Sequence, residues 1–364
     1  MTLIKVFIID DSAVVRKVLT TILNAAPNIC VIGSAMDPIF ALKHMEKDWP
    51  DVITLDIEMP RMDGLTFLKK IMLERPTPVI MCSTLTERGS RASIQALSYG
   101  AIDVISKPKG NLNQILPESS KLLCDAIRAA AKVKIGKVKV KPSTPITLPL
   151  VIAPKIHPDN FVPDIKKKRT GFKLPFIAIG TSTGGTQALE YVLTQLPINT
   201  PPILIVQHMP EKFTKAFAER LNSICQIEVK EAVDNDKLRQ GVALIAPGGQ
   251  HMMFEKNATS AFVRIKDGPL VSRHKPSVDV LFRSVSQYAD EQVLGIIMTG
   301  MGDDGAIGLK AMRDNGAYTI GQDENSCVVY GMPCEAQKKG GVCLEVPLQE
   351  IPNKIINYFN KFNG

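Results

Sequence analysis

The stretch LIKVFIIDDSAVVRKVLTTILNAAPNICVIGS at residues 3–34 decides the fold of the first half of this chain. A β-branched apolar run is followed by an amphipathic stretch and then by a second apolar run. The alternation continues to residue 131 and gives five expected strands and five expected helices. Apolar strands separated by helices are typical of a parallel sheet that is buried on both faces. We therefore predict a doubly wound α/β domain over residues 1–131, with right-handed crossovers.

A second α/β pattern occupies residues 174–364 and opens with FIAIGTSTGGTQAL at 176–189. Strand-then-helix order recurs through this region, and HMMFEKNATSAFVRIKD at 251–267 interrupts it with the pattern of a hairpin. We predict a doubly wound, mostly parallel α/β domain. Its ligand chemistry should lie at the carboxyl ends of the strands.

Residues 132–173 are predicted to be a basic, proline-containing linker between the two domains. The chain has 44 Lys and Arg against 36 Asp and Glu, a net charge of +8. The linker carries +9, whereas residues 1–131 carry +1 and residues 174–364 carry −2. A protein that wraps nucleic acid would be basic over its folded surface, so this distribution argues against that class. As a hypothesis, the KKKR run at 166–169 binds acidic protein tails or anionic lipid.

The remaining composition indicates a cytoplasmic protein. No segment approaches the roughly 20 apolar residues of a membrane span, and the amino terminus lacks the pattern of a secretory signal peptide. The seven cysteines form no C-x-x-C pair, which favours reduced thiols, and the five histidines lack the spacing of a zinc site.

Polar residues follow each of four strands in the first domain. They are Asp10 and Asp11 after the first strand, Asp56 after the third, Ser83 after the fourth and Lys107 after the fifth. Since the carboxyl ends of parallel strands meet at one edge, we expect these side chains to gather there. Three crowded carboxylates repel one another unless a cation neutralises them, and oxygen ligands suit Mg²⁺.

This spacing resembles the receiver domain of two-component response regulators, a flavodoxin-like fold, over about residues 3–125. The resemblance implies that Asp56 accepts a phosphoryl group from a histidine kinase. It also implies that Asp10, Asp11, Asp56 and the carbonyl of Glu58 surround the Mg²⁺, while Ser83 and Lys107 contact the new phosphate. At the position where many receivers carry an aromatic switch residue this chain has Val104.

In the second domain, Ser182 lies between an apolar strand and a helix, flanked by small residues. The backbone N–H groups of Thr183, Gly184 and Gly185 at the helix start would point at a group beside it. The motif is neither a phosphate-binding P-loop nor a G-x-G-x-x-G turn, and it departs from the G-x-S-x-G elbow. We favour the interpretation that Ser182 is a nucleophile. The alternative is that this turn binds the phosphates of a nucleotide.

A nucleophilic serine needs a base and a carboxylate. His208 in ILIVQHMP follows the next apolar strand, and His251 in APGGQHMMF is a second candidate. Asp303 and Asp304 both lie in the loop TGMGDDG after a later strand, and sequence physics alone does not choose between them.

The motifs GTSTGG, VQHMP, ALIAPGGQHM, HKPSVDVLFRSV, TGMGDDG and CVVYGMPCEA together closely resemble the catalytic domain of the CheB family of chemotaxis protein-glutamate methylesterases. The resemblance implies a triad of Ser182, His208 and Asp304, with the backbone N–H of Met301 helping to hold the oxyanion. Thr181 stands where the family commonly has Ala, and Cys334 where it commonly has Arg.

The predicted function is hydrolysis of glutamate γ-methyl esters on chemoreceptors, with release of methanol, and deamidation of receptor glutamines. No cofactor is expected in the esterase site. The receiver is expected to cover this site until Asp56 is phosphorylated, and the protein to be recruited to chemoreceptor arrays. The alternative from another class is a DNA-binding response regulator, which would need a compact helix-turn-helix in place of 190 residues of α/β pattern.

Overall fold

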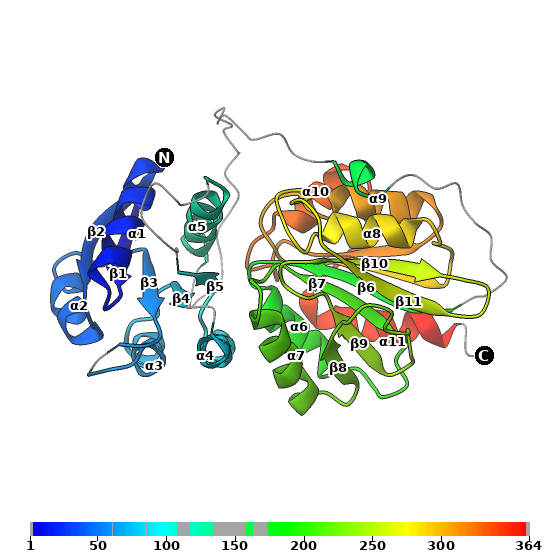
Figure 1. Cartoon of the computed structure of the whole chain (residues 1–364), viewed down its shortest axis with the longest axis horizontal. Helices are drawn as coiled ribbons and strands as arrows, with labels where there is room; N and C mark the ends of the chain where they lie inside the picture. The colour runs from blue at the N-terminus through cyan, green and yellow to red at the C-terminus, as the bar shows by residue number, and fades with distance from the viewer. Residues whose placement is uncertain are drawn as a thin grey trace.

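The computed structural model describes residues 3–59, 61–83, 86–107, 117–133, 157–162 and 174–361. Figure 1 shows two α/β domains side by side. Most of the predicted linker, including the KKKR run at 166–169, lies outside the described residues. Within the described part of the chain, no helix is long and apolar enough to cross a membrane.

The first domain is the predicted five-stranded parallel sheet with helices on both faces. Its strands are β1 (Ile4–Ile9), β2 (Ile29–Ala35), β3 (Val52–Asp56), β4 (Val79–Ser83) and β5 (Asp103–Ser106), in the order β2-β1-β3-β4-β5. Its helices are α1 (Ala13–Ala25), α2 (Pro38–Met45), α3 (Gly64–Glu74), α4 (Glu87–Ser98) and α5 (Pro117–Ala130). Strands β3 and β4 are buried along their whole length, as expected for a sheet covered on both sides.

Short polar side chains start the first helices of this domain. The hydroxyl of Ser12 accepts a hydrogen bond from Val15 N–H at the start of α1. The carboxylate of Asp37 accepts two from Ile39 and Phe40 at the start of α2. Such caps satisfy backbone donors that have no partner inside the helix, so they fix where each helix begins.

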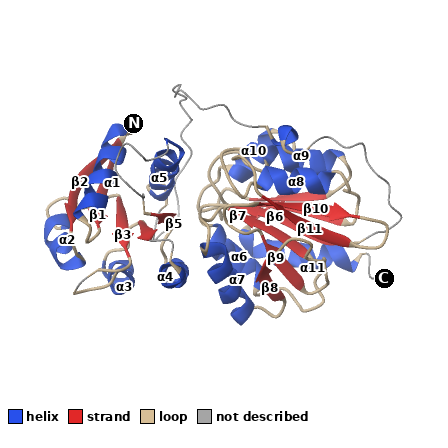
Figure 2. Cartoon of the chain, viewed as in Figure 1, coloured by secondary structure: helices blue, strands red, loops and turns tan. Residues whose placement is uncertain are grey.

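The second domain contains a seven-stranded parallel sheet in the order β14-β13-β12-β6-β7-β9-β8. The strands are β6 (Phe176–Thr181), β7 (Ile203–Gln207), β8 (Glu228–Glu231), β9 (Val242–Ile245), β12 (Val293–Ile297), β13 (Tyr318–Gln322) and β14 (Leu344–Val346). The helices are α6 (Gly185–Leu193), α7 (Phe213–Ile224), α8 (Val278–Ser286), α9 (Ala306–Asp314), α10 (Met332–Lys338) and α11 (Ile351–Asn360), with short 3₁₀ turns at Pro158–Asn160 and Leu348–Glu350. Figure 2 shows these helices packed on both faces of the sheet.

The predicted hairpin is confirmed as the antiparallel pair β10 (His251–Lys256) and β11 (Ala261–Lys266). The sequence analysis did not predict α10, β14 and α11. Strand β14 has only three residues at the sheet edge, and α10 has seven residues with a proline in its first turn, so neither carries a full period of apolar residues.

Strand β6 lies between β7 and β12, and the chain order reverses at this point. In open parallel sheets such a reversal leaves a crevice at the carboxyl ends of the neighbouring strands. Ser182, His208 and the loop after β12 therefore meet at one place in the fold.

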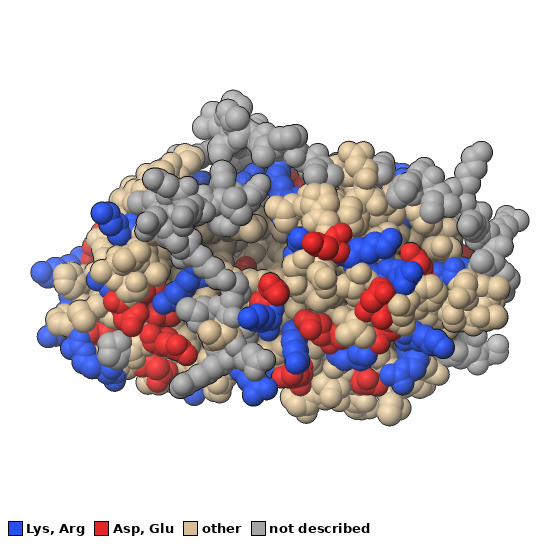
Figure 3. All heavy atoms as spheres, viewed as in Figure 1, with Lys and Arg blue, Asp and Glu red and all other residues tan. Residues whose placement is uncertain are grey.

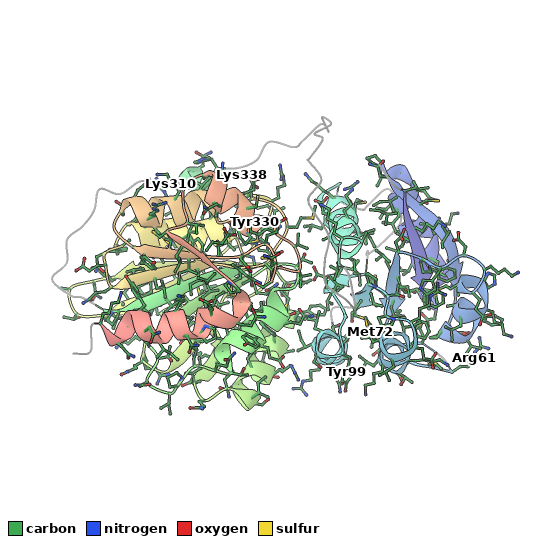
Figure 4. The ribbon with its side chains drawn as sticks, turned by 180° about the vertical axis from the view of Figure 1, so that it is seen from behind. Arg61, Met72, Tyr99, Lys310, Tyr330 and Lys338 are labelled. Carbon is green, nitrogen blue, oxygen red and sulfur yellow. The ribbon has the colours of Figure 1, made fainter. Side chains whose placement is uncertain are left out.

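Helix α4 of the first domain packs against α6 and α7 of the second. Ile94 and Leu97 from α4 belong to the same buried apolar cluster as Leu189 from α6 and Phe217 from α7. In the view from behind, Met72 on α3 and Tyr99, just after α4, lie on the side of the first sheet that these two helices cover (Figure 4). On the face shown in Figure 3, the acidic and basic side chains that the structure describes are interspersed over both domains. This agrees with domain charges near zero.

Candidate active site

Ser182 occupies a sharp turn between β6 and α6. Its backbone N–H donates to the carbonyl of Thr299 (3.0 Å), and its carbonyl accepts from Gly185 N–H (2.7 Å). Gly184 directly precedes α6 as its N-cap, with a φ of 77° in the left-handed region that favours glycine. A Cβ at Gly184 would come within 2.5 Å of Val328, so the turn has no room for a side chain there. Ser182 itself is half-buried at the surface of the turn.

His208 lies on the strand next to Ser182. Strands β6 and β7 are parallel and Thr181 is paired with Gln207, so Ser182 and His208 both follow directly on paired positions. The amide of Gln207 holds the two segments together, because its Nε2 donates to the carbonyls of Ser182 and His208, each at 3.0 Å. Thr181, the departure from the family pattern, donates from its hydroxyl to Gln207 Oε1 (2.5 Å).

Asp304 is fully buried and bonds directly to the candidate base. His208 Nε2–H donates to Asp304 Oδ2 at 2.7 Å. The carboxylate also accepts from Ser277 Oγ (2.8 Å) and from the backbone N–H groups of Val278 (2.8 Å) and Asp279 (2.9 Å) at the start of α8. A helix amino terminus stabilises an anion in this way.

These contacts keep Asp304 ionised. Burial alone would raise the pKa of Asp304, but the hydrogen bond and the charge interaction with His208, together with the N–H of Asp279, outweigh it and lower the pKa to about 2. Asp303, the other candidate, is only half-buried and lies in the turn that begins α9. The structure therefore brings Asp304 to His208.

With Nε2 held by Asp304, the Nδ1 atom of His208 is the nitrogen left to act as a base. It is buried and makes no hydrogen bond to any residue in the described part of the chain. His251, the competing histidine, has both nitrogens occupied by backbone. Its Nδ1 accepts from Ser277 N–H (3.2 Å) and its Nε2–H donates to the carbonyl of Pro269 (2.9 Å), which suits a structural role beside α8.

The loop after β12 lies against the turn that carries Ser182. A Cβ on Gly300 would approach within 2.8 Å of the Cβ of Ser182, so this loop lies directly against the serine. Met301 follows in the same loop, and Thr183 follows Ser182. The hydroxyl of Thr299 donates to the carbonyl of Thr183 (2.9 Å), which fixes the two segments relative to each other. Both predicted oxyanion donors therefore lie on segments that border Ser182.

His274 is a site residue that the sequence analysis missed. Its ring lies flat on that of His208, with ring centroids 3.7 Å apart and planes 6° apart. The motif HKPS was noticed in the sequence, but nothing in its spacing connected it to a base 66 positions earlier. The connection depends on the turn before α8, which tertiary packing places against His208.

The predicted phosphorylation site forms a second cluster, at the carboxyl edge of the first sheet. Carboxylate oxygens of Asp10, Asp11 and Asp56 lie within 4.8 Å of one another. Lys107 Nζ lies 2.6 Å from Asp56 Oδ2 and 2.9 Å from Asp10 Oδ2. Ser83 ends the adjacent strand β4, and Glu58 lies two residues past Asp56 with an exposed side chain.

Burial raises the pKa of Asp56 to about 6; Lys107 opposes this rise and Asp10 adds to it. Burial likewise raises the pKa of Asp10. Crowded, desolvated carboxylates of this kind are stabilised by a divalent cation, and an all-oxygen donor set fits Mg²⁺. The residues present therefore fit the predicted ion.

A polar contact joins the two domains at their interface. The hydroxyl of Thr183 donates to Oδ2 of Asp103, the first residue of β5, at 3.0 Å. Gln187 Nε2, on α6, donates to the carbonyl of Leu97 (3.3 Å) in the last turn of α4 and to that of Ala101 (2.8 Å) after this helix. The residue that follows Ser182 is thus bonded to the first domain.

Comparison with known proteins identifies both halves. Residues 177–355 match the CheB methylesterase family, and residues 6–116 match the response regulator receiver domain. A protein-glutamate methylesterase/protein-glutamine glutaminase from Shewanella oneidensis is 54% identical over 356 residues, covering 98% of this chain and 99% of that protein. One from Chromobacterium violaceum is 55% identical over 355 residues, covering 97% and 98%. The Thermotoga maritima CheB methylesterase catalytic domain superimposes with a TM-score of 0.50 at 34% identity, covering 51% of this chain and 99% of that one.

Proposed function

This chain belongs to the CheB methylesterase family, and we propose that it hydrolyses glutamate γ-methyl esters on chemoreceptors and deamidates receptor glutamines under the control of its receiver domain. The observation that carries the proposal is the 2.7 Å hydrogen bond from His208 Nε2–H to the buried carboxylate of Asp304. His208 follows β7, the strand paired with the one that leads to Ser182. Nothing in the comparisons favours the DNA-binding alternative, since the catalytic half matches a methylesterase.

In the proposed reaction, Ser182 Oγ attacks the γ-carbonyl carbon of the ester and its proton passes to His208 Nδ1. Asp304 stabilises the imidazolium that forms, and the backbone N–H groups of Thr183 and Met301 hold the oxyanion. When the carbon–oxygen bond breaks, the same proton leaves on methanol. Water then attacks the glutamyl-serine ester, gives a proton to His208 and releases glutamate and free Ser182. A glutamine substrate follows the same course, with ammonia as the first product.

The receiver is proposed to repress this site when unphosphorylated. The contacts of Thr183 and Gln187 with the first domain support this, because they occupy the segment that follows the nucleophile. Val328 supports it further, since it lies on the turn at Gly184 and packs against the apolar cluster that lines α5. Phosphorylation would shift the population from a covered state to an open one.

We propose that Asp56 receives the phosphoryl group from a chemotaxis histidine kinase. Asp10, Asp11, Asp56 and the carbonyl of Glu58 would hold Mg²⁺, which neutralises charge during the transfer. Lys107 and Ser83 would then contact the phosphate, whose added charge and acceptor oxygens pull their loops inward. Recruitment to cytoplasmic chemoreceptor arrays, through the basic segment at 166–169, completes the proposal.

The test is methanol release from methylated receptor membranes by the full chain. We expect slow release without a phosphodonor and faster release with acetyl phosphate and Mg²⁺. Ser182→Ala should abolish both. Methanol release that survives Ser182→Ala would contradict the mechanism, and covalent labelling of Ser182 by a fluorophosphonate would separate a serine hydrolase from a nucleotide-binding domain.

A further inference from the structure

The catalytic imidazole is held by one hydrogen bond and one ring contact. His208 is bonded through Nε2 to Asp304, and its Nδ1 has no hydrogen-bond partner among the described residues. One hydrogen bond at Nε2 does not by itself stop the ring from rocking about its Cβ–Cγ bond. The ring of His274, stacked at 3.7 Å with a 6° angle between planes, lies across this rotation.

The backbone before α8 locks His274 in place. Val271 and His274 exchange backbone hydrogen bonds of 3.1 and 2.9 Å around a two-residue turn. Ser272 and Arg273 in that turn have φ values of 49° and 72°, left-handed conformations that non-glycine residues rarely adopt. Ser272 Oγ ties the turn to α8 by donating to Asp279 Oδ2 (2.8 Å). Such backbone conformations persist only where the surrounding structure holds them, and they are frequent at functional sites.

His274 is also fixed within the turn and remains neutral. Its Nδ1–H donates to the carbonyl of Ser272 at 2.9 Å, which sets both the tautomer and the ring plane. Burial, followed by repulsion from His208, lowers the pKa of His274 to about 3, although Asp304 opposes this. A neutral ring does not repel the proton that His208 must accept from the serine.

The face-to-face geometry favours stacking over metal binding. Nitrogen atoms of His208 and His274 and an oxygen of Asp304 lie within 4.8 Å of one another. The lone pairs of ring nitrogens, however, lie in the ring planes, and two nearly parallel planes 3.7 Å apart do not direct them at one ion. The arrangement is suited to orienting a ring.

We propose that His274 is a positioning residue that fixes the ring plane of His208 by stacking, so that Nδ1 faces Ser182 before substrate binds. The expected effect on kcat rests on the proposed function. The orientation of the His208 ring by His274 does not depend on which reaction the site catalyses. Because misplacing a reacting group by about 1 Å can cost on the order of 100-fold in rate, loss of the stack should appear in kcat.

Two variants of the full chain separate the ring from its hydrogen bond. His274→Asn keeps an amide donor near the position of Nδ1 and removes the ring, whereas His274→Phe keeps a flat ring and removes the donor. We expect His274→Asn to lower kcat for methanol release by about 10- to 100-fold with KM nearly unchanged. His274→Phe should retain most of the activity. His44→Asn, an exposed histidine on α2, is the matched control.

A spectroscopic measurement reads the same geometry without activity. In ¹⁵N-histidine-labelled protein, the His208 Nε2–H bonded to Asp304 should give a downfield proton signal in the wild type and in His274→Phe. It should broaden or disappear in His274→Asn, while thermal unfolding confirms that each variant is folded. If His274→Phe does not fold, His274→Asn alone decides the matter.

Two results would overturn the proposal. One is a folded His274→Asn with wild-type kcat and an unchanged Nε2–H signal. The other is activity retained in His274→Asn and lost in a folded His274→Phe, which would assign the effect to the hydrogen bond. If the wild type and His44→Asn release no methanol, the proposed function fails, and the proton signal still tests whether His274 orients His208.

Discussion

The hydroxyl of Thr183 donates a 3.0 Å hydrogen bond to Asp103, and this bond connects the residue after the nucleophile to the receiver. Burial raises the pKa of Asp103 to about 6, although the hydrogen bonds from Val104 N–H and Thr183 oppose the rise. A carboxyl group whose pKa is higher in the covered state than in water stabilises that state below its ordinary pKa. This contribution is lost as the pH rises through about 6.

Asp103→Asn tests this linkage, because the amide keeps an oxygen acceptor for Thr183 and cannot ionise. We expect the unphosphorylated wild type to release methanol faster than the variant at about pH 7.5, and the two rates to draw together as the pH falls from about 6 toward the ordinary Asp pKa of about 4. Taking the ratio of the two rates removes the pH dependence of the catalytic groups themselves. Glu74→Gln, on the exposed end of α3, is the control, and a wild-type-to-variant ratio independent of pH would contradict the prediction.

Asp304→Asn should be among the most damaging changes in the catalytic site. The carboxylate accepts four hydrogen bonds, from His208, Ser277, Val278 and Asp279, and an amide NH₂ group would face one or more of these donors. Loss of the ring orientation and of the charge that stabilises imidazolium should lower kcat by roughly 10⁴-fold. Steady-state methanol release measures it. Asp303→Asn is the matched control, and equal losses in the two variants would be inconsistent with the assignment.

Gly184→Ala tests the fit of the nucleophile turn. A methyl group there would meet Val328 at 2.5 Å, and alanine disfavours a φ of 77° by about 1 kcal/mol. We expect at least a tenfold loss in the rate of Ser182 labelling by a fluorophosphonate, which corresponds to a rise of about 1.4 kcal/mol in the barrier. Adding Val328→Ala should restore part of the rate by making room. No recovery in the double variant would mean that backbone strain alone is responsible.

Lys107→Met tests how the phosphorylation site signals. Lys107 bridges Asp56 and Asp10, and its charge is the proposed contact for the phosphate. We expect the ratio of methanol release with and without acetyl phosphate to fall toward one, while intact-mass measurement still detects a phosphorylated chain. Lys43→Gln on the exposed face of α2 should leave the ratio unchanged. Full activation of Lys107→Met would remove this lysine from the signalling path.

Much of the fold and the main site could be predicted from the sequence because both repeat a simple pattern. Strand ends followed by polar residues located Ser182, His208 and Asp56, since parallel strands place such positions at one edge. The choice between Asp303 and Asp304 needed either a family resemblance or the position of the α8 amino terminus, which no local pattern reveals. The contacts of His274 and Asp103 were missed for a related reason: each residue contacts a partner distant in sequence.

The apolar contact between the two domains should make the repression temperature-dependent. This contact includes Ile94 and Leu97 of the first domain and Leu189 and Phe217 of the second. Closing the two domains removes apolar surface from water, and near room temperature this driving force is mainly entropic and carries a negative heat-capacity change. Repression built on such an interface weakens on cooling. The unphosphorylated enzyme should therefore be relatively more active in the cold, compared with its own phosphorylated form, so that adaptation to a stimulus would depend on the temperature of the cell as well as on its signals.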